Sequence, residues 1–380
     1  MPARVDTTGN LQTDLGFMAE ARDLAVRIPV RPWPNPPVGA VIVKDSEIIG
    51  RGMHHGAGSA HAERVALAET GAAARGATLY CTLEPCNHHG RTGPCTEAIL
   101  EAGIGRVVYA VADPNPQASG GAARLREAGV EVVGGVLTEL CLDLIWPFVC
   151  TDQFARPYVE LKTATSLDGR FAGPADPAGR PGYLTSEASR RDVHARRRWV
   201  DLVLVGSGTA RHDHPRLDVR LADDPGDGPV AAPAAGVVAA DGGHDAPLNR
   251  DQWLVFHADR NAGALPADAE GVPVAVDGRG RLDCADLLQA CGARGLQAVM
   301  LEGGPNLASS FLAAGLVDRW VQYVAPALVG GGPTWPAWIS NEKASFSLTR
   351  ADRIGPDVRL IWDRRDFAAT LDLLTPGEAC

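Results

Sequence analysis

Four residues in the first part of the sequence have the types and spacing of a catalytic metal site. His61 and Glu63 stand two residues apart, and Cys86 and Cys95 follow them along the chain. One imidazole and two thiolates form a three-ligand set for Zn²⁺ that leaves a fourth position open for water. The ion would acidify that water, and the Glu63 carboxylate would carry its protons. These residues therefore indicate metal-assisted hydrolysis.

The spacing of these residues reduces the number of hydrolytic reactions that they could catalyse. Residues two apart in the middle of a helix point in different directions, so His61 and Glu63 can act together only where a helix begins. Gly58 and Ser59 just before them allow such a start. One histidine, two cysteines and a glutamate that is not a ligand are the components of the zinc nucleobase deaminases, which remove an amino group from a base.

The two cysteines are separated by a longer segment than in many deaminases. Residues 87–94 are polar and basic and contain two glycines, so we predict a substrate-binding loop. By itself, His61 would be explained as a core histidine and each cysteine as a small buried side chain. The four residues together favour the metal site. We expect only burial for the remaining cysteines, which are Cys81, Cys141, Cys150, Cys284, Cys291 and Cys380.

Alternating helices and strands must position these residues. The patterns predict helices at 14–28, 61–74, 96–102 and 122–128, a hairpin at 38–49, and strands at 77–83, 106–111 and 130–133. Such alternation is typical of a layered α/β domain, and we place its end near Trp146 and Pro147.

A second alternating series starts at Pro157. It predicts strands at 158–163, 202–205, 253–256, 298–301 and 321–324, and helices at 186–198, 284–291 and 306–314. Residues 223–247 are rich in Ala, Gly, Pro and Asp, and we predict a mobile insertion or surface excursion there. The chain therefore divides into two domains, which we place at residues 11–150 and 155–370.

Composition excludes several classes of protein. The chain has 380 residues, of which 45% are hydrophobic and 22% charged, and a net charge of −10. These values fit a folded globular protein, and the acidity disfavours binding to nucleic acid or to an anionic membrane. No apolar run is long enough to cross a membrane, and residues 1–10 carry no apolar signal core. We expect a cytoplasmic homo-oligomer whose partner is a small-molecule substrate.

The motifs of the first domain strongly resemble one family, the bifunctional deaminase–reductases of riboflavin biosynthesis. The resemblance rests on residues 34–39 (PNPPVG), 61–63 (HAE), 83–95 (LEPCNHHGRTGPC) and 113–116 (DPNP). It implies a cytidine-deaminase-like three-layer fold and hydrolytic deamination of a phosphoribosylated diaminopyrimidinone, with Zn²⁺ as cofactor. By resemblance, Glu63 is catalytic, the ligands are His61, Cys86 and Cys95, and the substrate contacts are Asn35, His54, His88 and Arg91.

The second domain carries weaker signals when taken alone. Gly206 and Gly208 are explained as a tight turn, and the strand-to-helix segment at 301–307 offers backbone N–H groups for a phosphate. Together with residues 161–169, these segments resemble the reductase half of the same family, which has a dihydrofolate-reductase-like α/β fold and uses NADPH. The resemblance implies cofactor contacts at Ala164, Tyr183, Thr209, Asp213 and Gly304. It implies substrate contacts at Lys162, Arg197, Leu217, Arg220 and Glu302.

Departures from the family pattern keep alternatives open. Tyr183 stands where a Trp is usual, and the segment near 237–249 lacks the arginine of the family. The main hypothesis is a deaminase that also reduces the ribose of its product with NADPH to a ribityl chain. Alternatives are a deaminase with a degenerate reductase domain, a deaminase acting on nucleic acid, and a silent relative that serves assembly. We expect the arginines at 190, 191, 196 and 198 to lie on a solvated helix face.

Overall fold

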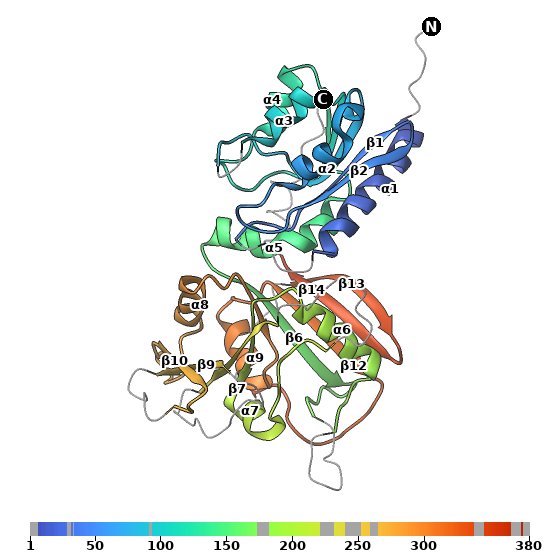
Figure 1. Cartoon of the computed structure of the whole chain (residues 1–380). Helices are drawn as coiled ribbons and strands as arrows, with labels where there is room; N and C mark the ends of the chain where they lie inside the picture. The colour runs from blue at the N-terminus through green and yellow to red at the C-terminus, as the bar shows by residue number, and fades with distance from the viewer. Residues whose placement is uncertain are drawn as a thin grey trace. The chain divides into compact units, whose positions relative to one another are not determined.

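The computed structural model of the chain describes residues 7–28, 32, 34–90, 93–172, 182–220, 232–239, 252–258, 265–337, 346–365 and 374. The chain separates between Ala155 and Arg156 into two compact units, and Leu374 near the C-terminal end belongs to the first. Each unit is built around its own sheet (Figure 1). Within the described part, no helix is long and apolar enough to span a membrane.

The first unit is a five-stranded sheet covered by helices (Figure 1). Its sheet has the order β2-β1-β3-β4-β5, in which β1 is antiparallel to β2 and β3, while β3, β4 and β5 are parallel. The elements are α1 (Thr7–Val26), β1 (Gly39–Lys44), β2 (Glu47–Met53), α2 (Ala62–Thr70), a 3-10 turn (Gly71–Ala74), β3 (Thr78–Leu83), α3 (Cys95–Ala102), β4 (Arg106–Val111), α4 (Gly121–Glu127), β5 (Glu131–Gly134) and α5 (Thr138–Phe154).

Glycines allow helices to lie directly on both faces of this sheet. A Cβ on Gly39 would lie 2.0 Å from the Ala21 oxygen of α1, and a Cβ on Gly52 would lie 1.9 Å from the Ala62 oxygen of α2. Gly52 pairs with Ala40, the neighbour of Gly39, and successive residues of a strand face opposite sides of the sheet. Therefore α1 and α2 cover opposite faces, and the three-layer arrangement is confirmed.

The second unit is a nine-stranded sheet of order β10-β9-β8-β7-β11-β6-β12-β14-β13. The strands from β10 to β12 are parallel, and β14 and β13 extend the sheet in antiparallel pairs. The elements are β6 (Tyr158–Ser166), α6 (Glu187–Arg197), β7 (Leu202–Gly206), α7 (Ser207–Asp213), β8 (Ala234–Val238), β9 (Trp253–Ala258), β10 (Ala269–Val274), α8 (Cys284–Ala293), β11 (Ala298–Leu301), α9 (Pro305–Ala313), β12 (Arg319–Ala325), β13 (Phe346–Ile354) and β14 (Asp357–Arg364).

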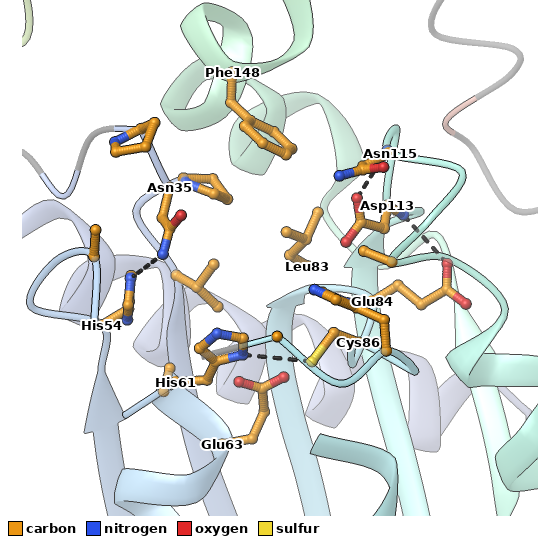
Figure 2. A pocket seen from close by; sticks show the side chains of 18 of the residues that line it. Asn35, His54, His61, Glu63, Leu83, Glu84, Cys86, Asp113, Asn115 and Phe148 are labelled. Carbon is orange, nitrogen blue, oxygen red and sulfur yellow. Dashed lines mark hydrogen bonds between the residues drawn. The ribbon is translucent and has the colours of Figure 1, made fainter. Parts of the chain in front are cut away.

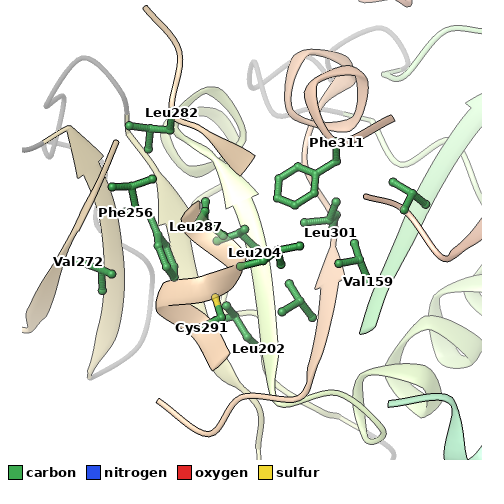
Figure 3. Packing of buried hydrophobic residues seen from close by; sticks show 14 of the residues in the cluster. Val159, Leu202, Leu204, Phe256, Val272, Leu282, Leu287, Cys291, Leu301 and Phe311 are labelled. Atoms are coloured by element: carbon green, nitrogen blue, oxygen red, sulfur yellow. The ribbon is translucent and has the colours of Figure 1, made fainter. Parts of the chain in front are cut away.

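The main hydrophobic core of the second unit lies where the parallel strands meet α8 and α9. Figure 3 shows Leu204, Phe256 and Leu301 from the strands packed with Leu287 of α8 and Phe311 of α9. All five side chains are at most 1% exposed. This core holds the carboxyl ends of β7, β8 and β11 next to one another, where ligands bind in open parallel sheets.

The prediction of a surface excursion at 223–247 is wrong for its described part. Residues 234–238 form β8, an interior strand between β7 and β9. The Ala-Ala-Gly-Val-Val composition reflects tight packing, because a Cβ on Gly236 would lie 2.9 Å from Leu204 and 3.0 Å from Phe256. Residues 223–231 and 240–247 lie outside the described residues.

Candidate active sites

The three predicted metal ligands come from the ends of three elements and converge. His61 is the residue immediately before α2, Cys95 is the first residue of α3, and Cys86 follows β3. The His61 Nδ1 lies 3.5 Å from the Cys86 Sγ (Figure 2) and 3.3 Å from the Cys95 Sγ, and all three donor atoms lie within 4.8 Å of one another. One nitrogen and two sulfurs at this separation suit Zn²⁺ and leave a coordination position toward the cavity.

Local chemistry at these donors also suits a metal. Hydrogen bonds from Cys95 and His61 lower the pKa of Cys86 to about 4, whereas Cys86 and burial raise the pKa of Cys95. The pair therefore favours one thiolate, the form of cysteine that binds a metal. Cys86 and Cys95 are buried. Cys81, Cys141, Cys150 and Cys291 are buried elsewhere in the two units and Cys284 is half-buried, in line with the expectation for them.

Glu63 lies beside the three donors, in the first turn of α2. The backbone of His61 is extended, with φ −67° and ψ 156°, so the chain turns into the helix between the two residues and both side chains face one cavity (Figure 2). The helix start required by their spacing is thus confirmed. Glu63 is 4% exposed, and burial raises its pKa. A carboxyl group beside a metal site can both accept and donate a proton.

The cavity at this site has a volume of about 360 Å³ and includes Asn35, His54 and His88 in its lining. His54 Nδ1 lies 3.1 Å from the Ala60 carbonyl oxygen. A carbonyl only accepts, so this nitrogen carries the proton and His54 Nε2 accepts from Asn35 Nδ2 at 2.9 Å. Burial lowers the pKa of His54, so the neutral form is favoured. This hydrogen bond uses an amide proton of Asn35 and leaves its Oδ1 for another partner. Arg91 lies outside the described residues.

Three further residues line the same cavity, and none of them has a role predicted from the sequence. Asp113 and Asn115 follow β4, and Phe148 projects from α5 on the side away from His61 and Glu63 (Figure 2). Burial raises the pKa of Asp113 to about 7, although its Oδ1 accepts the Asn115 backbone N–H at 2.9 Å. The DPNP motif at 113–116 could have identified Asp113 and Asn115 as site residues. Phe148, in contrast, lies on a helix that was not predicted.

In the second unit, three of the expected substrate contacts form one charged cluster. Arg197 Nε donates to Glu302 Oε1 at 2.5 Å, and Arg197 NH2 donates to Oε2 at 2.9 Å. Lys162 Nζ lies 3.9 Å from Glu302 Oε2. Burial alone would raise the pKa of Glu302, but Arg197 and Lys162 outweigh it and lower the pKa. Burial lowers the pKa of Lys162, against the attraction of Glu302.

The other two expected substrate contacts lie in the segment after α7. The Arg220 backbone N–H donates to His194 Nδ1 at 3.2 Å, and the Arg220 side chain pairs with Asp218. Asp218 also accepts from Arg197 NH1 through its carbonyl at 2.8 Å, so Arg220 is connected to the charged cluster. Leu217 is 2% exposed, and its φ of 51° lies in the left-handed region.

One arginine of α6 departs from the predicted solvated face. Arg196 donates to Glu160 Oε1 at 2.7 Å and to Oε2 at 2.5 Å, and the two side chains are 19% and 7% exposed. The expectation is therefore wrong for Arg196, because the carboxylate of β6 lies under the helix. Arg191 does pair with Glu187 at an exposed position.

A second cavity, of about 680 Å³, brings together three of the five expected cofactor contacts: Thr209, Asp213 and Gly304. The Gly206–Gly208 segment leads into α7 and is not only a tight turn. Gly304 precedes α9, whose first residue is Pro305, and a Cβ on Gly304 would lie 3.7 Å from Thr209 Oγ1. Because Gly304 has no side chain, a dinucleotide phosphate can approach the backbone at the start of α9. These residues therefore fit NADPH.

The remaining two expected cofactor contacts lie elsewhere. Ala164 and Tyr183 are not among the described residues that line this cavity. Tyr183 is 82% exposed, and the Arg190 guanidinium lies 4.8 Å from the centre of its ring. Ala164 is half-buried in β6.

Comparison with known proteins covers both units. Residues 11–111 match the cytidine and deoxycytidylate deaminase zinc-binding region, and residues 157–360 match the RibD C-terminal domain. The riboflavin biosynthesis protein RibD of Mycobacterium tuberculosis is 40% identical over 334 residues, covering 86% of this chain and 91% of that protein. RibD of Escherichia coli is 36% identical over 362 residues, covering 90% of this chain and 97% of that protein.

Solved structures agree with this result. Acinetobacter baumannii RibD aligns with a TM-score of 0.76 and 33% identity, covering 93% of this chain and 99% of that one. A diaminohydroxyphosphoribosylaminopyrimidine deaminase/5-amino-6-(5-phosphoribosylamino)uracil reductase from Thermotoga maritima aligns with a TM-score of 0.77 and 31% identity, with the same coverage of 93% and 99%.

The two folds and their cavities define the class of protein: a bifunctional enzyme in which a zinc-dependent deaminase domain precedes an NADPH-dependent reductase domain. The fold expected from the sequence is confirmed for both domains. Within that class, the chain belongs to the RibD family of riboflavin biosynthesis.

Proposed function

We propose that the first unit removes the amino group of 2,5-diamino-6-(phosphoribosylamino)pyrimidin-4-one by hydrolysis, and that the second unit then reduces the ribose of the product to a ribityl chain. The convergence of His61, Cys86 and Cys95 beside Glu63 carries the first half of the proposal. The Thermotoga relative is named as a deaminase and reductase of phosphoribosylamino compounds, which supports the choice of substrate.

In the deaminase half, His61, Cys86 and Cys95 would hold a zinc ion, and the ion would supply an activated water. Glu63 would take a proton from the attacking water and return it to the leaving amino group, and burial, which raises its pKa, makes the carboxylate a stronger base for the first of these steps. Asn35 and neutral His54 orient the base through the free amide oxygen of Asn35. His88 and Arg91 complete the contacts, with Arg91 suited to the substrate phosphate.

In the reductase half, Thr209, Asp213 and Gly304 would hold NADPH in the cavity that they line, and the cofactor would supply a hydride. Ala164 and Tyr183 complete the proposed cofactor contacts. The charged cluster of Lys162, Arg197 and Glu302 holds the substrate, with Leu217 and Arg220 at its edge. These last assignments come from the family resemblance.

We further propose the domain limits 11–150 and 155–370, a homo-oligomer, and a small-molecule substrate in place of a nucleic acid. The net charge of −10 opposes a phosphate backbone. A cytoplasmic location belongs to the same proposal.

A coupled assay tests both halves. Zinc-loaded protein is incubated with the diaminopyrimidinone, and ammonia release is measured with and without NADPH. We expect one ammonia per substrate in both cases, and NADPH oxidation only after deamination. Ammonia release without any NADPH oxidation would favour the second candidate, a deaminase whose reductase domain no longer reacts. The observation that favours this second candidate is that Tyr183 is exposed and is not among the described residues that line the cavity.

A further inference from the structure

The cavity of the second unit contains one arginine that none of the proposed roles uses. Among the described residues that line it, Arg281 is the single Arg or Lys side chain, and Asp213 lines the same cavity. NADPH carries several negative charges, and the chain itself has a net charge of −10. A cation in the wall of this cavity would therefore have a large effect on the affinity for a phosphorylated ligand.

A rigid turn holds Arg281 in place. The Asp277 backbone N–H donates to the Arg281 carbonyl at 2.7 Å, and the Gly280 N–H donates to the Asp277 carbonyl at 3.0 Å. Gly280 has a φ of 74°, which favours glycine. The Arg281 backbone N–H also donates to Asp277 Oδ1 at 2.9 Å. The backbone of Arg281 is thus fixed before any ligand binds, which reduces the ordering cost of binding.

The side chain of Arg281 is oriented from two sides. On one edge, Nε and NH2 lie 3.2 Å and 3.1 Å from Asp277 Oδ2. On the other, NH1 donates to Ser310 Oγ of α9 at 3.5 Å. Ser310 Oγ in turn donates to the Asn306 carbonyl at 3.0 Å, and both α9 residues line the cavity. The side chain is still 35% exposed and lines the cavity, so part of the guanidinium is accessible to a ligand.

The surroundings of Asp213 and of Arg281 in this cavity differ in character. Asp213 interacts electrostatically with Lys162, so the Asp213 end faces the charged cluster where the ribose would be reduced. Arg281 shares the wall with Val238, at the end of β8, and with Leu282 and Leu287 (Figure 3 shows the two leucines). An apolar wall beside a positioned arginine suits an adenine ring next to a phosphorylated ribose. NADPH differs from NADH by one phosphate at that ribose.

We propose that Arg281 binds the 2′-phosphate of NADPH and makes the reductase prefer NADPH to NADH. The inference rests on the proposed function, in which this cavity receives NADPH. Asp277 and Ser310 act as positioning residues, because each contacts the guanidinium of Arg281, which lines the cavity. A charge-assisted hydrogen bond to a phosphate is among the stronger polar contacts in proteins.

The test measures binding, with no need for turnover. Dissociation constants for NADPH, NADH, adenosine 2′,5′-bisphosphate and 5′-AMP are determined by calorimetry with wild type, Arg281→Gln, Arg281→Lys and Arg279→Gln. Arg279 is the matched control, because it is exposed and belongs to the same turn but not to the described cavity lining. We expect Arg281→Gln to weaken NADPH and the bisphosphate by about tenfold or more. NADH and 5′-AMP should change less than twofold, Arg281→Lys should restore part of the loss, and Arg279→Gln should resemble wild type.

Two results would overturn the inference, and they are distinguishable. If wild type binds NADPH but Arg281→Gln weakens NADPH and NADH equally, or neither, then Arg281 does not recognise the 2′-phosphate. If wild type binds neither nucleotide, the proposed reductase function fails together with this inference. Unchanged NADH affinity in Arg281→Gln would also show that the variant is folded.

Discussion

Arg197 of α6 and Glu302 after β11 form a doubly hydrogen-bonded ion pair, although 105 positions separate them in the sequence. The pair joins a helix to the carboxyl end of a central strand, and Lys162 of β6 approaches the same carboxylate at 3.9 Å. Arg197 and the Glu302 side chain are each 8% exposed. One carboxylate therefore compensates two cations in a poorly hydrated place.

Glu302→Gln should destabilise the second unit and abolish reduction. The change removes the carboxylate that Arg197 and Lys162 share, at a cost of about 3 kcal/mol in the free energy of unfolding. Urea unfolding and NADPH oxidation are the measurements, and deamination should be unaffected. Glu160→Gln is the control, since it breaks the similarly buried pair with Arg196. It should cost comparable stability while the remaining folded protein still oxidises NADPH. Equal loss of activity in both variants would contradict a specific role for Glu302.

Glu63→Gln should stop deamination without releasing the metal. The amide keeps the shape of the side chain but cannot carry a proton, so the rate of ammonia release should fall by about 10²–10⁴-fold. Zinc measured by atomic absorption should remain near one per chain. Glu97→Gln on α3 is exposed and should leave both values unchanged. Metal loss in Glu63→Gln would show that the glutamate acts as a ligand.

Cys86→Ser should remove the zinc, whereas Cys81→Ser should not. Cys86 supplies one of the three converging donors. Cys81 is equally buried but hydrogen-bonds weakly to the Val108 carbonyl, at 3.8 Å. Zinc per chain after dialysis against a weak chelator distinguishes the two variants. Retention of zinc by Cys86→Ser at the wild-type level would contradict the metal assignment.

Gly52→Ala should disturb the metal site through the packing of α2. The added Cβ would lie 1.9 Å from the Ala62 oxygen and 2.7 Å from the Ala66 nitrogen, so the helix must move, at a cost of about 1–3 kcal/mol. His61 directly precedes this helix, and zinc affinity should fall as well. Gly16→Ala in α1 has no atom within 4 Å of its new Cβ and should stabilise by about 0.5–1 kcal/mol. Thermal unfolding and zinc titration are the measurements.

Asp113 should make stability depend on pH between about 4 and 7. Burial raises its pKa to about 7 in the folded protein, above the usual value of about 3.9. The folded state therefore binds a proton that the unfolded state has lost, and its stability decreases as pH rises through this range. Relative to Asp113→Asn, wild type should lose up to about 1.4 kcal/mol per pH unit and then level off above about pH 8. Urea unfolding from about pH 5 to 9 measures the difference. A constant difference would contradict the raised pKa.

Short-range patterns predicted most of the elements and the metal site. The ligands lie in two short motifs whose spacing already required a helix start at His61. In contrast, α5 was not predicted, because Pro147 resembles a helix end and Leu137, in the left-handed conformation, offers no side-chain cap. Phe148 was missed for the same reason.

Elements whose stability comes from distant contacts were also missed. β8 consists of small residues, and the reason for their size is evident only in the folded structure, where Gly236 lies against Leu204 and Phe256. β13 exposes most of its side chains and pairs only with β14 at the edge of the sheet, so its composition carries little hydrophobic pattern. The buried pair of Arg196 and Glu160 joins residues 36 positions apart, and the helix sequence alone indicated a solvated arginine.

Every described residue that lines the zinc cavity belongs to the first unit, and every one that lines the second cavity belongs to the other unit. The two half-reactions therefore share none of these side chains, and either can be switched off alone. Glu63→Gln mixed with Glu302→Gln would complement in trans only when the deaminated intermediate leaves one molecule and enters another. The yield of such a mixture, compared with wild type, would measure how freely that intermediate is exchanged.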